Sequence, residues 1–116
     1  MVITADRTAS PPALRGAYAA SKAAAQALAM TLSREVAELG ITVNCVAPGP
    51  LDTPGFREDV ERLARMTGKD PAAISEDVGK ALPLGRLTDP EEAAAVVSFL
   101  LSPEASGITG TVIPVG

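Results

Sequence analysis

The 116-residue chain contains no histidine and a single cysteine, Cys45. A Ser-His-Asp triad requires an imidazole, and a structural zinc site requires several cysteine or histidine ligands. Both are therefore excluded, and we expect no metal site. Cys45 cannot form an internal disulfide, and its apolar neighbours Val43, Val46 and Ala47 predict a buried thiol. A reduced, buried cysteine is typical of a cytoplasmic protein.

The chain also lacks clustered basic residues and long apolar runs. Its net charge is −4, so nothing in it resembles the Lys/Arg patches that bind nucleic acid. No apolar stretch approaches the length of a membrane span, and residues 1–8 lack the apolar core of a signal peptide. Aromatic residues make up 3% of a chain that is 47% hydrophobic. The apolar content is largely alanine, which favours closely packed helices over an aromatic pocket.

The pattern along the chain alternates between strand and helix. Met1–Thr4 resembles the end of a strand, and Asp6–Gly16 resembles a loop. The further expected elements are a helix over Ala17–Leu39, a buried strand over Ile41–Val46, helices over Phe56–Met66 and Ala72–Leu82, a helix from Pro90 to about Ser102, and a strand over Thr111–Val115. The order β-α-β-αα-α-β predicts an α/β fold with a parallel sheet, in one domain spanning residues 1–116.

Several residues mark where these helices begin and end. Leu28, Leu32, Val36 and Leu39 recur at helical spacing and predict one apolar stripe along the first helix, which Gly40 should end. Other helix starts carry their own signals: Asp70 as N-cap before Pro71, and Asp89-Pro90 with Glu92 three residues beyond the cap.

Tyr18 and Lys22 are four residues apart near the start of the long helix, so their side chains leave one face. A free phenol has a pKa of about 10, and a nearby cation favours the phenolate. A tyrosine tuned in this way can exchange a proton with a carbonyl oxygen at neutral pH. Spacing alone also fits a packed tyrosine beside a lysine that extends to solvent, because this spacing is common in helices.

The sequence context favours the catalytic interpretation. Tyr18-Ala-Ala-Ser21-Lys22, an alanine-rich helix and Ile41-Thr-Val-Asn44-Cys-Val-Ala-Pro48-Gly49 together resemble the short-chain dehydrogenase/reductase family. The later blocks Pro83-Leu-Gly-Arg86-Leu-Thr-Asp-Pro90 and Ser106-Gly-Ile-Thr-Gly110 resemble the same family, with a lean toward its bacterial 3-oxoacyl-[acyl-carrier-protein] reductase members. The resemblance covers essentially the whole chain. It implies the C-terminal half of a doubly wound, Rossmann-like parallel sheet.

The resemblance also implies roles for particular residues. Tyr18 would be the acid/base, and Lys22 would lower its pKa and bind the nicotinamide ribose of NAD or NADP. Pro48 and Gly49 would open a loop beside the nicotinamide, where the Leu51 amide and the Thr53 hydroxyl would meet the carboxamide. The implied reaction is hydride transfer between the cofactor and a ketone or secondary alcohol. The helices between residues 56 and 82 would form a substrate lid. The alternative interpretation of this segment is plain surface packing. Asn44 would be structural.

The sequence departs from the family at the catalytic serine. Counting back about thirteen residues from Tyr18 reaches Ala5, which cannot donate a hydrogen bond. Thr4, Thr8 or Ser10 could substitute, and each also fits an ordinary loop residue.

The glycine-rich turn that holds the cofactor pyrophosphate is absent from the sequence. We therefore expect a truncated relative that, by itself, neither binds NAD(P)H tightly nor reduces carbonyls, and that is oligomeric or poorly soluble. A non-catalytic interaction module and the remnant of a truncated gene are the alternatives. In the first, the alanine-rich helix would pair with a second helix, as it does in homo-oligomers of the family. An in-frame glycine-rich turn upstream of Met1 would instead identify part of a normal enzyme.

Overall fold

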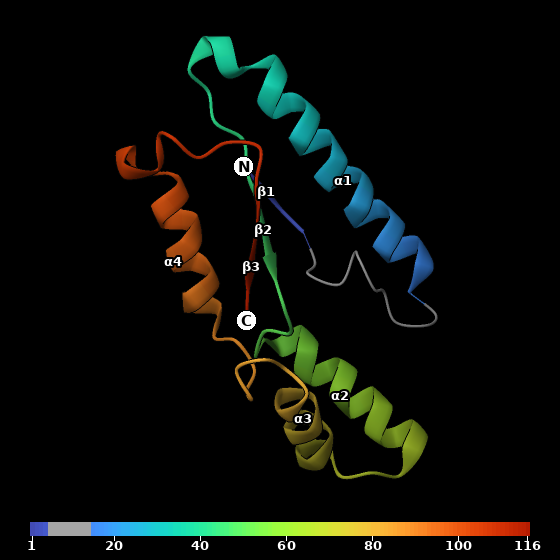
Figure 1. The fold of residues 1–116 in the computed structure, drawn as a ribbon. Coiled ribbons are helices and arrows are strands. Elements are labelled where there is room, and N and C mark those ends of the chain that lie inside the picture. The colour runs from blue at the N-terminus through green and yellow to red at the C-terminus, as the bar shows by residue number, and fades with distance from the viewer. Residues whose placement is uncertain (5–14) are drawn as a thin grey trace.

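The computed structural model describes residues 1–4 and 15–116, so most of the expected loop over residues 6–16 lies outside the described residues. The strands and helices follow in the predicted order (Figure 1). They are β1 (Val2–Ile3), α1 (Gly16–Glu35), the 3₁₀ turn η2 (Ala37–Leu39), β2 (Cys45–Pro48), α2 (Pro54–Thr67), α3 (Pro71–Lys80), α4 (Pro90–Leu100), the 3₁₀ turn η3 (Pro103–Ala105) and β3 (Val112–Val115). The predicted α/β class with a parallel sheet is confirmed.

The sheet has the order β1-β2-β3, and both pairings are parallel. Val2 pairs with Cys45 on one side of β2, and Cys45 pairs with Val112 on the other. β2 is therefore the central strand, bonded along both edges. Parallel pairing places the carboxyl ends of all three strands at the same edge of the sheet.

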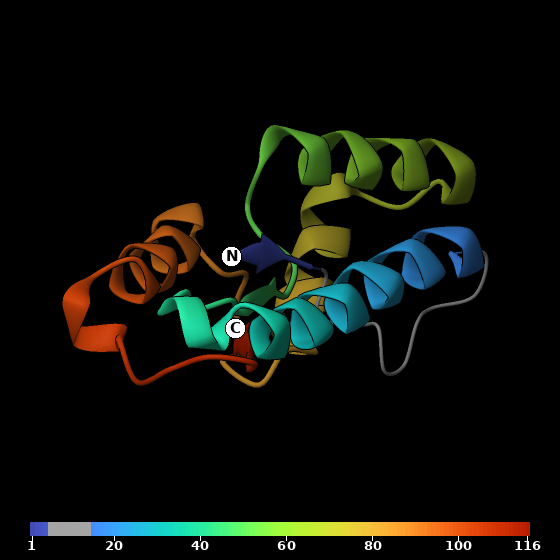
Figure 2. The same cartoon turned by 90° about the horizontal axis from the view of Figure 1, so that it is seen from above.

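Helices cover both faces of this sheet (Figure 2). Successive strand residues point to opposite faces, so Cys45 packs with Ala29 of α1, whereas Val46 packs with Leu100 of α4. On β3, Val112 joins the α1 side and Ile113 joins the α4 side in the same alternation. The result is a three-layer arrangement in which β2 is buried from both sides, as parallel strands usually are.

The strand predicted over Ile41–Val46 is displaced toward the C-terminus, to Cys45–Pro48. Of the residues before the strand, Val43 and Asn44 bind the turn before β3, whereas Ile41 donates its N–H back to Val36 O. Val43 donates its N–H to Thr109 Oγ1 at 3.1 Å and accepts from Gly110 N–H at 2.8 Å. The buried Asn44 amide donates to Ile108 O at 2.8 Å and accepts from Thr111 N–H at 3.3 Å. These contacts agree with the structural role expected for Asn44.

Most of the apolar stripe predicted for the long helix is exposed, and of its four residues only Val36 packs on the core beneath α1. Leu28 is 67% exposed and Leu32 is 38% exposed, whereas Ala19, Ala29 and Ser33 are buried. Small side chains let the helix approach the strands closely, and this gain in packing decides which face turns inward. The α-helix itself ends at Glu35, four residues before the predicted end, and continues as η2 to Leu39. Gly40, with φ of +71°, ends η2 as predicted.

The expected starts of the later helices are largely confirmed. Asp70 caps α3 by accepting a hydrogen bond from Ala72 N–H at 3.2 Å, and Pro71 is the first helical residue. At α4, the Glu92 carboxylate accepts from Asp89 N–H at 2.9 Å, which is half of a capping box. α2 begins at Pro54, two residues earlier than predicted, because Thr53 caps it. No helix in the described part of the chain is long and apolar enough to cross a membrane.

Helices α2 and α3 form a hairpin that projects beyond the sheet (Figure 1). The hairpin has its own small core of Val60, Ala64 and Ile74, with Phe56 packed against it. The radius of gyration is 16.3 Å, against about 13 Å for a compact domain of this length. The projecting hairpin accounts for much of this elongation.

Close packing between α1 and the turn before β3 yields a stability prediction. Gly110 has φ of +68°, and a Cβ there would lie 2.8 Å from Ser33 Oγ. Gly110→Ala should therefore lower the unfolding free energy by about 1 kcal/mol for the left-handed backbone and by about 1–3 kcal/mol more for overpacking. Gly85→Ala is the matched control, because Gly85 has φ of +71° and nothing within 4 Å of the added Cβ. Equal losses in urea denaturation would contradict the close contact.

Candidate functional site

Tyr18 and Lys22 lie together on the first turns of α1, as their spacing predicts. The Lys22 ammonium is 5.6 Å from the centroid of the Tyr18 ring, within the range of a cation–π contact. The Tyr18 side chain is 48% exposed, so its phenol is open to a ligand, whereas Lys22 is half-buried. Lys22 is on the same helical row as the buried Ala29, seven residues on. The pair therefore stands at the border between the packed face and solvent.

The second part of the site is the loop that follows β2. Pro48 is the last residue of β2, and Gly49 donates its N–H to Val115 O at 2.9 Å. This hydrogen bond extends the pairing with β3 by one residue before the chain turns away from the sheet. The loop thus leaves from the carboxyl edge, where open α/β sheets bind their ligands.

Leu51 is held in this loop by a short parallel bridge to Thr88. Thr88 donates its N–H to Pro50 O and accepts from Asp52 N–H, both at 3.2 Å. In a parallel bridge of this kind, the N–H and C=O of Leu51 itself point away from Thr88. Leu51 C=O accepts from Thr53 N–H at 2.9 Å, and no residue in the described part of the chain accepts from the Leu51 N–H. The loop therefore presents one free backbone donor.

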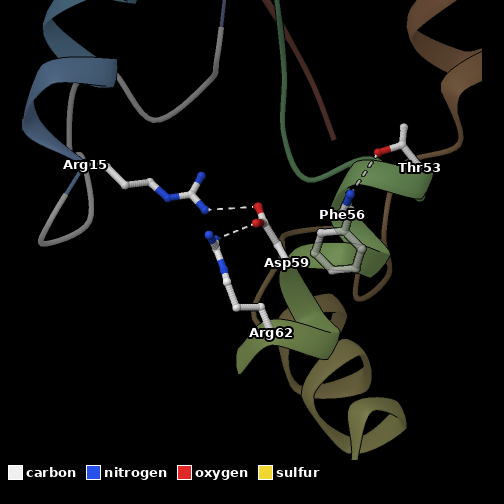
Figure 3. A network of polar contacts seen from close by, with 5 residues as sticks. All are labelled: Arg15, Thr53, Phe56, Asp59 and Arg62. Atoms are coloured by element: carbon white, nitrogen blue, oxygen red, sulfur yellow. Dashed lines mark hydrogen bonds and ion pairs between the residues drawn. The ribbon is translucent and has the colours of Figure 1, made fainter. Parts of the chain in front are cut away.

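Thr53, two residues after Leu51, supplies a second donor. Its Oγ1 accepts a hydrogen bond from Phe56 N–H at 3.3 Å and so caps α2 (Figure 3). A hydroxyl has one proton to donate besides its acceptor lone pairs, so the cap leaves that proton available. Asp52 is tied to the same helix by an ion pair with Arg57 at 2.8 Å, which holds the pKa of the Asp52 carboxyl below its usual value. The loop and the first turn of α2 are therefore one connected unit.

The six residues expected to form the site fall into two groups. Tyr18 and Lys22 form one, and Pro48, Gly49, Leu51 and Thr53 form the other. A further contact, which the sequence did not predict, links the start of α1 to α2. Arg15, just before α1, forms an ion pair with Asp59 of α2 at 3.3 Å (Figure 3). Thr88 was also missed, because its role depends on backbone hydrogen bonds that no residue type signals.

The candidates for the family's serine are only partly described. Ala5, Thr8 and Ser10 lie outside the described residues. Thr4 is buried at the end of β1 and donates its N–H to Val46 O at 2.8 Å. Its hydroxyl has no hydrogen-bond partner among residues 1–4 and 15–116.

Cys45 lies away from these groups, in the middle of the sheet. It is fully buried between α1 and β3, and burial raises the pKa of its thiol. A buried thiol held in its neutral form is a poor nucleophile. The predicted buried cysteine is confirmed, and Cys45 belongs to the core rather than to the site.

Comparison with known proteins shows the family of the chain. A family model described as enoyl-(acyl carrier protein) reductase matches residues 2–116. The structure of a short chain dehydrogenase family protein from Francisella tularensis matches with a TM-score of 0.90 at 30% identity, covering 98% of this chain and 48% of that one. The chain belongs to the short-chain dehydrogenase/reductase family.

Two further matches are to proteins that are themselves named as an oxidoreductase and a reductase. Oxidoreductase UcpA of Salmonella typhimurium is 41% identical over 110 residues, which cover 94% of this chain and 40% of UcpA. L-sorbose reductase from Gluconobacter frateurii, solved with NADPH and L-sorbose, matches with a TM-score of 0.90 at 28% identity, covering 98% of this chain and 44% of that one. This short-chain dehydrogenase/reductase chain thus spans about two-fifths of the length of the curated relatives that it matches.

The segment that leads from Thr88 into α4 yields a pH prediction. Arg86 donates two hydrogen bonds to Glu92, at 2.8 and 2.7 Å, and Asp89 N–H adds a third. Together they lower the pKa of the Glu92 carboxyl from 4.5 to about 2. Because the folded state favours the ionised form, the stabilisation is present above pH 4.5 and is lost as the pH falls toward 2.

The melting temperature of the wild type should therefore fall more steeply across this pH window than that of Glu92→Gln. Glu91→Gln, in the same helical turn, removes one carboxylate without touching Arg86 and should keep the wild-type slope. Parallel melting curves for wild type and Glu92→Gln would contradict the assignment.

Proposed function

We propose that this chain carries the proton-transfer and nicotinamide-orienting part of a reductase or dehydrogenase acting on a ketone or secondary alcohol. The observation that carries the proposal is the exposed Tyr18 phenol with the Lys22 ammonium 5.6 Å from its ring. A bound NAD or NADP supplies or accepts the hydride. Tyr18 donates its proton to the carbonyl oxygen in reduction and takes a proton from the alcohol in oxidation.

Lys22 acts beside the tyrosine. Its ammonium has three N–H donors and no acceptor, so it can reach ribose hydroxyls while it remains next to the phenol ring. The half-buried position limits its rotamers and directs the charge toward the Tyr18 side of the helix. The cofactor ribose is therefore the group that we assign to Lys22.

The residues after β2 fit a nicotinamide carboxamide. The free Leu51 N–H and the available Thr53 hydroxyl proton are two donors on adjacent parts of one loop. A carboxamide oxygen accepts two hydrogen bonds. Here one donor is a backbone amide held in place by Thr88, and the other is a side-chain hydroxyl held in place as the cap of α2. Pro48 and Gly49 begin this loop at the sheet edge and set its direction. A ring held there would present one face to the substrate.

The proposal covers only part of a cofactor site. Residues 1–116 would be the C-terminal portion of one Rossmann-like domain, with the pyrophosphate held by residues outside this range. The NADPH named for L-sorbose reductase makes NADPH the first cofactor to test, with NADH beside it. The resemblance to 3-oxoacyl reductases makes a 3-oxoacyl thioester the first substrate to test. A cytoplasmic location stays a prediction.

A homo-oligomer is proposed on a separate observation. The exposed Leu28 and Leu32 lie on the side of α1 that does not pack on this sheet. Exposed leucines at helical spacing are typical of a face that pairs with a second helix. The same face would serve the alternative function, a non-catalytic interaction module.

The assignment of Tyr18 is tested by Tyr18→Phe in the protein that carries this chain. Turnover with NADPH and a ketone panel should fall about a hundredfold or more, because the proposed proton donor to the carbonyl oxygen is lost. The Kd for NADPH should change little. Turnover within about threefold of wild type would remove Tyr18 from the mechanism.

The carboxamide role of Thr53 is tested by Thr53→Val. This variant loses both the proposed contact and the α2 cap, so the KM for the cofactor should rise about tenfold, since a lost hydrogen bond costs about 1–1.5 kcal/mol. Thr53→Ser should keep the wild-type KM. Asp70→Ala is the control for stability, because it removes a cap of α3 only. An equal rise in KM for Asp70→Ala and Thr53→Val would show that lid stability, and not the hydroxyl, is responsible.

A further inference from the structure

The α2–α3 hairpin is built as a separate unit. Its buried residues pack against one another, with no residue of the sheet or of α1 in their cluster. A segment with its own core can move as a body when its connections allow it.

The hairpin is connected to the sheet at one narrow place. The segment that enters it and the segment that leaves it are paired through Leu51 and Thr88. Nearby, Gly79 of α3 lies against the backbone of Arg86, where an added Cβ would be 3.4 Å from the Arg86 Cα. These contacts fix the base of the hairpin. The position of the rest of the hairpin therefore depends on contacts elsewhere.

One ion pair links α2 to the residue just before α1, the helix that carries Tyr18. Arg15 Nη2 and Asp59 Oδ2 are 3.3 Å apart, and Arg15 is three residues before Tyr18. The other five ion pairs between described residues join positions no more than six apart in sequence. Arg15–Asp59 is thus the only ion pair in the described part of the chain that joins segments far apart in sequence.

Asp59 is oriented for this contact by its own helix. Arg62, one turn further on, donates to Asp59 Oδ1 at 2.6 Å, while Oδ2 faces Arg15 (Figure 3). The carboxylate lies between two guanidinium groups, and one of them comes from outside the hairpin. Both partners of the Arg15–Asp59 pair are about half exposed, at 52% and 48%.

We propose that the Arg15–Asp59 pair is a clasp that sets the closed position of the α2–α3 hairpin beside Tyr18. Asp59 is then a positioning residue that acts through the hairpin, and this role rests on the proposed function of Tyr18. A half-exposed pair shifts an equilibrium by about 1.4- to 5-fold, which is weak enough to break in every turnover. Its effect falls with added salt, because exposed charges are screened.

The experiment uses the protein that carries this chain, with spin labels at Ala27→Cys on α1 and Met66→Cys on α2, mixed with excess unlabelled protein so that the measured distances lie within one chain. Both positions are exposed, and the native Cys45 is fully buried. Wild type should give one main label–label distance. Asp59→Asn should add a second, longer distance. Raising the salt to about 1 M should do the same in every protein that keeps the Arg15–Asp59 pair, and should change nothing further in Asp59→Asn. Glu61→Gln is the matched control, since it removes an equal charge from α2 but pairs within the helix, with Arg65.

Kinetics give the second readout, with NADPH and a 3-oxoacyl thioester as probes. Asp59→Asn should raise the KM of the thioester about two- to fivefold with little loss of kcat, and Glu61→Gln should leave both unchanged. Arg15→Gln should give the same rise, and the double variant no more than either single one. Unchanged distances in Asp59→Asn would overturn the clasp even if the enzyme is active. Altered distances without any turnover would support the clasp while counting against the proposed function.

Discussion

The parallel pairing of β2 with strands on both sides is the constraint on which the rest of the structure depends. β2 is four residues long, with Cys45 and Val46 fully buried on opposite faces. A one-residue shift in register would move Cys45 toward α4 and Val46 toward α1, exchanging the two cores. The Asn44 side chain prevents such a shift, since it binds the turn before β3 on both of its polar groups.

This register also determines where the chemistry can occur. Because β2 ends at Pro48, the chain leaves the sheet at its carboxyl edge and passes Thr88, which takes the hydrogen bonds on one side of Leu51. The loop is left with a free Leu51 amide, two residues before the capping hydroxyl of Thr53. Donors that are already fixed need little reorganisation when a ligand binds. The loop after β2 therefore runs without interruption into the α2–α3 hairpin.

Local signals predicted much of this arrangement, and long-range packing decided the rest. Gly40, the Asp70 cap and the Tyr18–Lys22 spacing are each determined within a few residues, so the sequence was sufficient. The strand over Ile41–Val46 was misplaced because Asn44 finds its partners more than sixty residues away. The leucine stripe was misjudged because alanines allow closer approach to the sheet than leucines do. Thr88 and Asp59 carried no signal, since each matters only through a partner distant in sequence.

The central claim is that the Tyr18–Lys22 pair and the loop after β2 bind the two ends of one nicotinamide riboside. A crystal structure of the protein with an oxidised nicotinamide cofactor tests it most directly. The account predicts that the Leu51 amide nitrogen and Thr53 Oγ1 lie within about 3.2 Å of the carboxamide, and that Lys22 Nζ lies within the same distance of a ribose hydroxyl. A cofactor whose carboxamide is held elsewhere, with the Leu51 N–H bonded inside the protein, would contradict it.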